Sequence, residues 1–345
     1  MEHMNADRPK FIDLFSGAGG LGLGFRLAGF ESVWAVEKDL DAAATYELNF
    51  GHPVFSGAIE DVETVPEYAA AADVIVGGPP CQGFSPLGKM SPREEHEEMN
   101  QLWRQYLRVV DMMEPAVFLV ENVPEFLLSH EGRRMIELAE ERGYRIHSGV
   151  LNAYHFGVPQ RRRRGFILAS RLGELRLPEE TKMRRTVRDA IGDLPLLPDE
   201  VGWHIGRNPR PESLARYRAV PPGGNRFDLM RSRPDLTPRC WREKPTGSTD
   251  VFGRLEWDLP SLTIRTEFFK PEKGRYLHPE ADRPITHREA MRLQTFPDDF
   301  EWVGSKTSVA KQVGNAVPPE LARHLALAVL SHLAAASHER NEVAC

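Results

Sequence analysis

Short apolar segments alternate with helical segments through the first half of the chain, and this alternation limits the fold more than any other feature of the sequence. Apolar runs typical of buried strands occur at 11–15, 32–36, 73–76, 117–120, 144–151 and 165–169. Helical patterns lie between them at 20–27, 40–49, 102–113 and 132–142. Strands and helices that alternate in this way form a mostly parallel sheet covered by helices. We therefore predict an α/β fold with a doubly wound, Rossmann-like sheet.

The pattern changes after Ser170, where proline, glycine and arginine become frequent and regular periodicity fades until about Thr286. This change favours a smaller, irregular second domain. Thr286 and Glu289 have the spacing of a capping box, which predicts that a helix begins there. Residues 320–333 are strongly apolar and predict a further helix.

The net charge is mildly acidic, but the arginines are concentrated in one region. The formal net charge is −6. Residues 200–255 nevertheless contain eleven Arg and Lys against six Asp and Glu, and ten of the eleven are Arg. Arginine makes bidentate contacts to phosphate and guanine, so this region is a candidate nucleic-acid surface. The whole chain prefers Arg to Lys, 35 to 9, so the local excess is modest evidence.

Composition also limits compartment and metal chemistry. The first ten residues are polar, and no apolar run approaches the roughly 20 residues of a membrane span. The cysteines Cys81, Cys240 and Cys345 form neither a CxxC pair nor an even framework, so we expect no disulfide and no metal site. We expect a cytoplasmic protein without membrane contact. In that compartment Cys81, which follows two prolines, is a candidate nucleophile, although a small buried hydrophobe is the alternative.

A glycine-rich loop follows the first predicted strand. Residues 17–22 (Gly-Ala-Gly-Gly-Leu-Gly) match GxGxxG between a strand and a helix, where a ligand can approach the backbone closely. Glu37 ends the next strand and is placed to accept hydrogen bonds from ribose hydroxyls. Both NAD and S-adenosylmethionine fit this arrangement. The loop alone does not distinguish them.

Three groups of polar residues follow predicted strands, at the edge where a doubly wound sheet has its active site. They are Cys81, Glu121 with Asn122, and Gln160 with Arg162 and Arg164. A thiolate that adds to C6 of cytosine makes C5 nucleophilic toward a sulfonium methyl. An acid that protonates N3 eases this addition, provided that its pKa is raised. This combination favours a methyl donor over a dinucleotide in the glycine loop.

The sequence resembles the DNA (cytosine-5)-methyltransferase family, of the bacterial restriction-modification type, over nearly its whole length. The resemblance is carried by six segments in family order: FIDLFSGAGG at 11–20, GPPCQGFS at 78–85, ENV at 121–123, QRRRR at 160–164, REAMRLQ with FP at 288–297, and GNAVP at 314–318. It implies a Rossmann-like methyltransferase sheet with a target-recognition domain. It also implies S-adenosylmethionine as cofactor, S-adenosylhomocysteine as product, and double-stranded DNA as substrate.

The resemblance implies a role for each matching residue. Cys81 would attack C6, Glu121 would hold N3 and the exocyclic amine, and Arg162 and Arg164 would position Cys81 and the nucleotide. The implied cofactor residues are Phe15, Gly17, Gly19, Gly20, Glu37, Ile59, Asp61, Pro80, Asn315 and Val317. Chemistry at C5 and C6 requires the base to leave the duplex stack. The implied DNA contacts in the matching segments are Gln82, Ser85 and Gln160, and the irregular region adds candidate contacts to bases or phosphates at Arg226, Arg231, Arg233, Arg239, Arg242 and Arg254.

One position departs from the family pattern. Where many members have Asp-Ile after the second helix, with the Asp on the adenine amine, this chain has Ala58-Ile59. Asp61 could replace that contact after a small shift, or the backbone could make it. The departure concerns cofactor affinity rather than reaction type.

The resemblance also implies a discontinuous first domain. We expect a catalytic, S-adenosylmethionine-binding domain at 1–171 plus 304–345 and a target-recognition domain at 172–303, in a monomer near the nucleoid. A cognate restriction endonuclease that acts separately is an optional partner. Two alternatives stay open: an RNA cytosine-5 methyltransferase of the same fold, and a catalytically silent DNA-binding homologue.

Overall fold

The computed structural model describes residues 8–80, 101–243 and 250–343, and these belong to two compact units. The first unit comprises Met1–Phe156, Arg163–Lys182 and Val317–Cys345, and the second comprises Gly157–Arg162 and Met183–Ala316. Among the described residues, none of the helices combines the length and the apolar character needed to cross a membrane.

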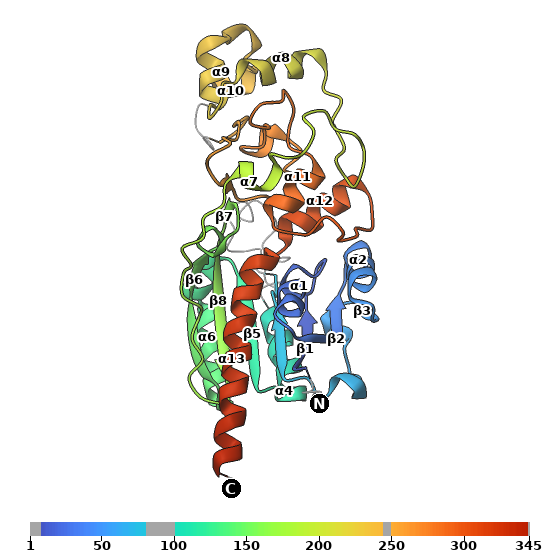
Figure 1. Ribbon diagram of the computed structural model, residues 1–345, viewed down its shortest axis with the longest axis vertical. Helices are drawn as coiled ribbons and strands as arrows, with labels where there is room; N and C mark the ends of the chain where they lie inside the picture. Colours follow the sequence, from blue (N-terminus) through green and yellow to red (C-terminus); the bar gives the residue numbers. More distant parts are fainter. Residues whose placement is uncertain (1–7, 81–100, 244–249, 344–345) are drawn as a thin grey trace, which may run out of the picture. The chain divides into compact units, whose positions relative to one another are not determined.

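A seven-stranded sheet with the order β3-β2-β1-β4-β5-β8-β6 forms the centre of the first unit (Figure 1). Neighbouring strands from β3 to β5 are parallel, whereas β8 runs antiparallel to both β5 and β6. The predicted mostly parallel α/β sheet is thereby confirmed. Its strands are β1 (Lys10–Leu14), β2 (Glu31–Glu37), β3 (Val54–Ser56), β4 (Val74–Gly77), β5 (Val117–Asn122), β6 (Arg145–Asn152) and β8 (Arg163–Ser170).

In the first unit α1 (Gly20–Leu27) packs with α13 (Pro319–Val343), and α6 (His130–Glu141) packs with α4 (Leu102–Met113) and with α5 (Pro124–Leu128). Helices α1 and α13 are close because Gly24 has no side chain; a Cβ there would lie 2.2 Å from Cβ of Ala322. On α4, the buried Tyr106 hydroxyl lies 3.2 Å from the carbonyl of Ile75 and 2.9 Å from that of Leu119. It therefore fastens α4 to both β4 and β5. Helix α2 (Leu40–Phe50) also belongs to this unit.

The second unit has little sheet and many short helices. Its described strands, β7 (Gln160–Arg161) and β9 (Ser261–Leu262), pair in parallel. A small apolar core contains Tyr217, Val220, Leu229, Phe252 and Leu277. The helices are α7 (Val187–Ile191), α8 (Pro211–Ala219), α9 (Arg226–Ser232), α10 (Arg239–Glu243), α11 (His287–Leu293) and α12 (Lys306–Asn315). The capping box of Thr286 and Glu289 begins α11, as predicted.

The predicted domain ranges differ from these two units at three places. Residues 157–162 belong to the second unit because β7 pairs with β9. Residues 304–316 belong there as well, since Gln294 donates to the carbonyl of Val313 in α12 at 2.6 Å. Residues 172–182 belong to the first unit, where the amide of Leu177 donates to Nδ1 of His147 at 3.2 Å.

Candidate active site

The strand order reverses between β1 and β4, and the two loops that follow these strands form the start of the site. The chain leaves β1 toward β2 and β3 on one side, whereas β4 continues toward β5 on the other. Open α/β sheets bind ligands at such a switch point, beyond the carboxyl ends of the strands. The loop after β1 is 15–19, and the segment after β4 is 78–80. The predicted cofactor loop and the segment that leads to Cys81 therefore emerge side by side.

The glycine loop is fixed by Glu37 at the end of β2. The amide of Gly17 donates to Oε2 of Glu37 at 2.8 Å, and the amide of Asp39 donates to Oε1 at 2.8 Å. A carboxylate has about four lone-pair positions, so both oxygens can still accept from hydroxyl groups. Phe15 and Gly17 have φ values of 56° and 54°, and a Cβ on Gly17 would find no atom within 4 Å. The loop thus leaves open space above its backbone.

Helix α2 closes the other side of this loop. A Cβ on Gly19 would lie 2.5 Å from the ring of Phe50 and 2.9 Å from that of Tyr46. These two rings stack with centroids 3.9 Å apart. Gly19 and Gly20 are buried, so their lack of side chains permits helix packing as much as ligand approach.

Asp13 lies in β1 below the glycine loop, a position whose importance the sequence does not reveal. Its carboxyl is fully buried, and a Cβ on Gly22 would lie 2.8 Å from Oδ2. Burial raises the pKa of Asp13 well above its usual range, and the negative charge of Glu37 adds to this rise. The amide of Gly22 offsets only part of it, without a hydrogen bond of ordinary geometry.

The segment with the departure from the family pattern is a short 3-10 turn, Ile59–Asp61. Ile59 is buried and Asp61 is exposed. Arg108 of α4 fastens this turn, since its guanidinium donates to the carbonyls of Ile59 and Val62, both at 2.6 Å. Arg108 therefore positions this turn, a role that the spacing of residues along the sequence does not suggest.

At the end of β5, Glu121 forms an ion pair with Arg164 of β8. Oε1 of Glu121 lies 2.9 Å from Nε of Arg164, and both side chains are largely buried. Oε2 faces the segment after β4, because a Cβ on Gly78 would lie 3.0 Å from it. The next residue, Asn122, donates through Nδ2 to the carbonyl of Pro79 at 2.9 Å. The acid thus lies beside the backbone that leads to Cys81; Cys81, Gln82 and Ser85 lie outside the described residues, and Pro80 is half-buried.

Gln160 and Arg162 belong to the second unit, where both are buried. Gln160 donates to Oε1 of Gln294 at 2.7 Å and accepts from the amide of Ile264 at 2.9 Å. The guanidinium of Arg162 donates to the carbonyls of Ile264 and Gly314, both at 3.0 Å. The contact of Arg162 with Gly314 holds the last turn of α12. The contacts of Gln160 and Arg162 are different from those predicted from the sequence, in which Gln160 contacts DNA and Arg162 positions Cys81 and the nucleotide.

Two predicted cofactor residues lie on either side of the division between the units. Asn315, the last residue of α12, is exposed and belongs to the second unit, whereas Val317 is buried and belongs to the first. The preceding Gly314 packs tightly, since a Cβ there would lie 2.3 Å from the amide nitrogen of Thr266.

Two of the predicted DNA contacts are buried in the second unit, which corrects their assignment. The guanidinium of Arg254 donates to the carbonyls of Tyr217, Val220, His278 and Ala281 and contacts Asp282. Arg226 is also buried, with its guanidinium 4.7 Å from the ring centroid of Phe227. Arginines inserted in this way stabilise the unit rather than present donors to DNA.

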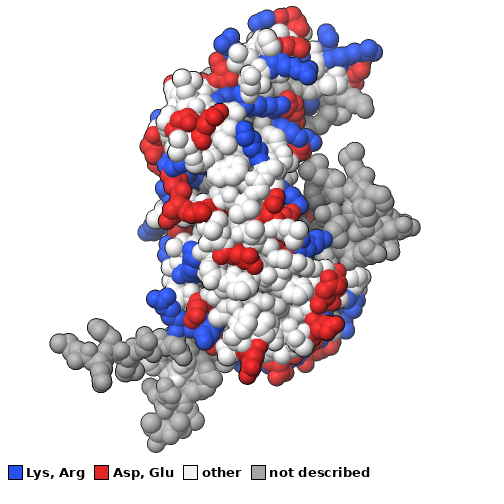
Figure 2. Space-filling model, turned by 90° about the vertical axis from the view of Figure 1, so that its right-hand side faces the viewer, with Lys and Arg blue, Asp and Glu red and all other residues white. Residues whose placement is uncertain are grey.

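The other predicted DNA arginines are exposed. Arg231, Arg233 and Arg239 pair with Asp228, Asp235 and Glu243 respectively, and Arg242 is exposed on α10. Exposed pairs of this kind contribute little to stability, so these side chains can exchange a carboxylate for a phosphate. On the face shown in Figure 2, acidic and basic side chains are interspersed, in agreement with the modest net charge.

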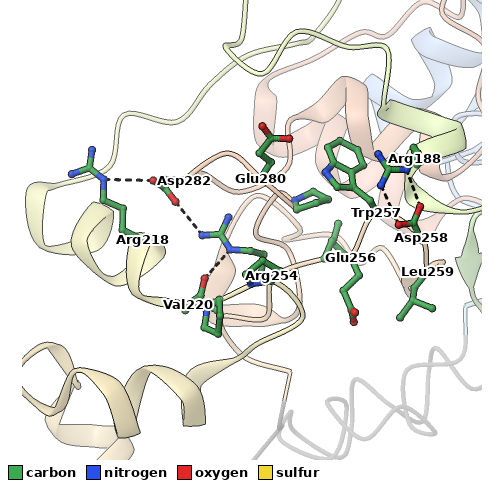
Figure 3. A pocket seen from close by; sticks show the side chains of 14 residues that line it. Arg188, Arg218, Val220, Arg254, Glu256, Trp257, Asp258, Leu259, Glu280 and Asp282 are labelled. Carbon is green, nitrogen blue, oxygen red and sulfur yellow. Dashed lines mark hydrogen bonds and ion pairs between the residues drawn. The ribbon is translucent and has the colours of Figure 1, made fainter.

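A pocket of about 610 Å³ opens within the second unit (Figure 3). On one side Arg188 pairs with Asp258 at 2.8 Å and lies over the ring of Trp257, 5.3 Å from its centroid. On the other side Arg218 and Arg254 approach Asp282 from opposite directions. The sequence shows no signal for this pocket, because its walls come from four separate segments.

Comparisons with known proteins decide the family. The family model described as C-5 cytosine-specific DNA methylase matches residues 9–331. The chain belongs to the C-5 cytosine-specific DNA methylase family. Its enzymatic activity is therefore that of a DNA (cytosine-5)-methyltransferase. These matches favour an active enzyme over the alternative of a catalytically silent DNA-binding homologue.

Similar methylases are found among bacterial proteins and solved structures. The type II methyltransferase M1.HphI of Haemophilus parahaemolyticus is 36% identical over 93% of this chain and 86% of its own. M.NgoFVII of Neisseria gonorrhoeae is 34% identical over 94% and 87%. A crystal structure of an E. coli prophage protein described as a DNA modification methyltransferase has a TM-score of 0.74 and 25% identity, and the match covers 94% of this chain and 99% of that one. The S. pombe Dnmt2 methyltransferase, with a TM-score of 0.63 and 19% identity over 94% and 99%, shares the fold.

Proposed function

We propose that this methylase transfers a methyl group from S-adenosylmethionine to C5 of a cytosine that has left the DNA duplex, through a covalent bond between Cys81 and C6. The observation that carries the proposal is the position of Glu121. Its carboxyl, paired with Arg164, lies against Gly78, three residues before Cys81. The acid proposed for the ring nitrogen thus lies beside the backbone segment that precedes the proposed nucleophile in the sequence.

The residues around the glycine loop fit the methyl donor. Glu37 has lone pairs left for ribose hydroxyls, and Gly17 borders open space. The donor supplies an electrophilic methyl group on a sulfonium. We assign binding to Phe15, Gly17, Gly19, Gly20, Glu37, Ile59 and Pro80, together with Asn315 and Val317 from the last motif. We still expect Asp61 to contact the adenine of S-adenosylmethionine.

The proposed reaction on the cytosine has three steps: addition of the thiolate, transfer of the methyl group, and elimination of the thiolate. The thiolate of Cys81 forms a bond to C6, while Glu121 holds the N3 proton that neutralises the ring. The electron pair displaced to C5 forms the new carbon–methyl bond while the sulfonium–methyl bond breaks, and S-adenosylhomocysteine leaves as the neutral thioether. Loss of the C5 proton to a base then expels the thiolate and restores the aromatic ring, and N3 returns its proton to Glu121. Arg164 keeps the carboxyl of Glu121 aimed at the base throughout.

We infer that double-stranded DNA is read by the second unit, with Arg231, Arg233, Arg239 and Arg242 as phosphate or base contacts. The names of the relatives place them among type II methyltransferases. We therefore propose a modification role beside a separate endonuclease of the same specificity, performed by a monomer. An RNA substrate is the second candidate, to be distinguished by the trapping experiment below.

The Cys81→Ser variant tests the covalent mechanism. A hydroxyl is a far weaker nucleophile than a thiolate, so methylation should fall by at least about 10³-fold, while binding of donor and DNA persists. Bisulfite sequencing of plasmid DNA from cells that express wild type or variant measures the effect and reveals the target sequence. DNA that is still fully methylated by Cys81→Ser would refute the adduct.

Trapping with 5-fluorocytosine tests the substrate. Fluorine cannot leave C5 as a proton does, so duplex DNA with this base at the target should remain bonded to the wild-type enzyme and not to Cys81→Ser. A band resistant to denaturing electrophoresis measures it. Trapping on structured RNA with none on the duplex would show that RNA is the substrate.

A further inference from the structure

Asn122 is the last residue of β5 and directly follows Glu121, and both ends of its side-chain amide are engaged. Nδ2 donates to the carbonyl of Pro79 at 2.9 Å, and Oδ1 accepts from the amide of Val123 at 2.8 Å. The side chain is only 6% exposed. One end of the amide must donate and the other must accept, so a single orientation satisfies both contacts.

The side chain of Asn122 holds the segment that precedes Cys81 through the carbonyl of Pro79. Proline has no backbone N–H, so neither Pro79 nor Pro80 can donate a hydrogen bond to a neighbouring strand. The ring of Pro80 also restricts the conformation of Pro79. The hydrogen bond to the Pro79 carbonyl therefore restrains the end of the described segment that precedes Cys81.

The same strand end holds the acid. Glu121 is paired with Arg164, and its other oxygen faces Gly78. Two consecutive residues of β5 therefore carry the acid and the tether to the nucleophile's segment. β4 and β5 are parallel neighbours, with Gly77 opposite Val120, so the Asn122 tether extends their alignment beyond the last backbone pair.

We propose that Asn122 is a positioning residue for methyl transfer, which sets the separation between the Glu121 carboxyl and the prolyl pair that leads into Cys81. This proposal rests on the proposed function, because it assigns Cys81 as the nucleophile. Asn122 touches neither the base nor the methyl group. It acts through the Pro79 carbonyl.

The Asn122→Asp variant has nearly the same shape but replaces the donor with an oxygen. At about pH 8 the introduced carboxylate faces the Pro79 carbonyl without a proton between them, and the tether is lost. The single-turnover rate of trapping on 5-fluorocytosine duplex should fall on the order of 10²-fold, as expected for a small misplacement of reacting groups. The dissociation constant for unmodified target DNA should stay unchanged.

A pH profile separates positioning from a general structural defect. As pH falls toward about 6, the buried introduced carboxyl gains a proton and can again donate to the Pro79 carbonyl. The ratio of the variant's trapping rate to that of wild type should therefore rise as pH falls. Asn152→Asp at the end of β6 is the matched control, since its Oδ1 only accepts, from the amide of Tyr154 at 3.3 Å, and its ratio should stay near one.

Asn122→Ala removes both hydrogen bonds without introducing charge and provides a second test, should the aspartate variant unfold. Its trapping rate per folded molecule should fall at every pH, with DNA binding retained. Rates equal to wild type in Asn122→Ala, or a pH-independent ratio in folded Asn122→Asp, would overturn the inference. Activity in Cys81→Ser would instead overturn the proposed function, so the two failures are distinguishable.

Discussion

The position of the Glu121 carboxyl depends on the absence of a side chain at residue 78. A Cβ on Gly78 would lie 3.0 Å from Oε2 of Glu121 and 3.4 Å from its backbone oxygen. We predict that Gly78→Ala displaces the carboxyl and lowers the methylation rate on the order of tenfold, with little change in DNA affinity. Initial rates of methyl incorporation into target DNA measure this.

Gly149→Ala is the control for that substitution. A Cβ on Gly149, in β6, would also lie 3.0 Å from its nearest atom, but that atom is the end of the flexible Leu177 side chain. Its methylation rate should remain near that of wild type. Equal rates for both alanine variants would show that Gly78 does not set the position of Glu121.

Single residues show where the sequence loses information. Residues 161–164 are four identical arginines, yet Arg162 is buried whereas Arg161 and Arg163 are exposed. Which of these arginines are buried is set by the strands β7 and β8, which are separated at Arg162. The sequence alone does not show that one strand ends and another begins there. The candidates Glu121 and Arg164 could be named from the motifs, but their ion pair depends on the antiparallel pairing of β5 with β8.

Among the elements, α11 begins in a buried ionic cluster that makes stability depend on pH. Arg283 contacts both carboxyl oxygens of Glu289, at 2.9 and 2.7 Å. Burial would raise the pKa of Glu289, but Arg283 lowers it. Burial lowers the pKa of His278 from 6.5 to about 4, against the opposing effect of Glu289. Nδ1 of His278 accepts from the amide of Ala281 at 2.9 Å, which also requires an unprotonated nitrogen.

The sign of the pH effect follows from His278. Between pH 6.5 and about 4 the unfolded chain binds a proton at this histidine and the folded chain does not, so stability falls as pH falls through this window. From about pH 7 to about pH 5 this one group should lower the free energy of unfolding by about 2 kcal/mol. Urea unfolding at several pH values measures the slope. His278→Gln should flatten it, whereas the exposed control His338→Gln should not.

Elements were predictable where an apolar period was long enough. Six strands of the central sheet and helices α2, α4 and α6 lie within a few residues of their expected positions, whereas β3, with only three residues, was not predicted. Helices α7 to α10 have five to nine residues, too few for a period to stand out in a region rich in Pro and Arg. Helix α12 was missed because Lys306, Lys311 and Gln312 interrupt its apolar face.

For the first unit as a whole, the contact of α1 with α13 links the beginning of the described chain to its end. A Cβ on Gly24 would lie 2.2 Å from Cβ of Ala322 and 2.6 Å from the amide nitrogen of Arg323, so backbone would have to move. We predict that Gly24→Ala costs at least about 2 kcal/mol and lowers the midpoint of thermal unfolding. Leu27→Ala, at an exposed position of α1, is the control. A midpoint equal to wild type in Gly24→Ala would show that the helices separate without cost.

The join between α1 and α13 also orders events during synthesis. Every strand of the central sheet leaves the ribosome before the helix that covers the Gly24 face of α1. Until then the face of α1 that contains Gly24 lacks the helix against which it packs. We therefore expect chains that end before α13 to leave this face of α1 exposed to water, chaperones and proteases.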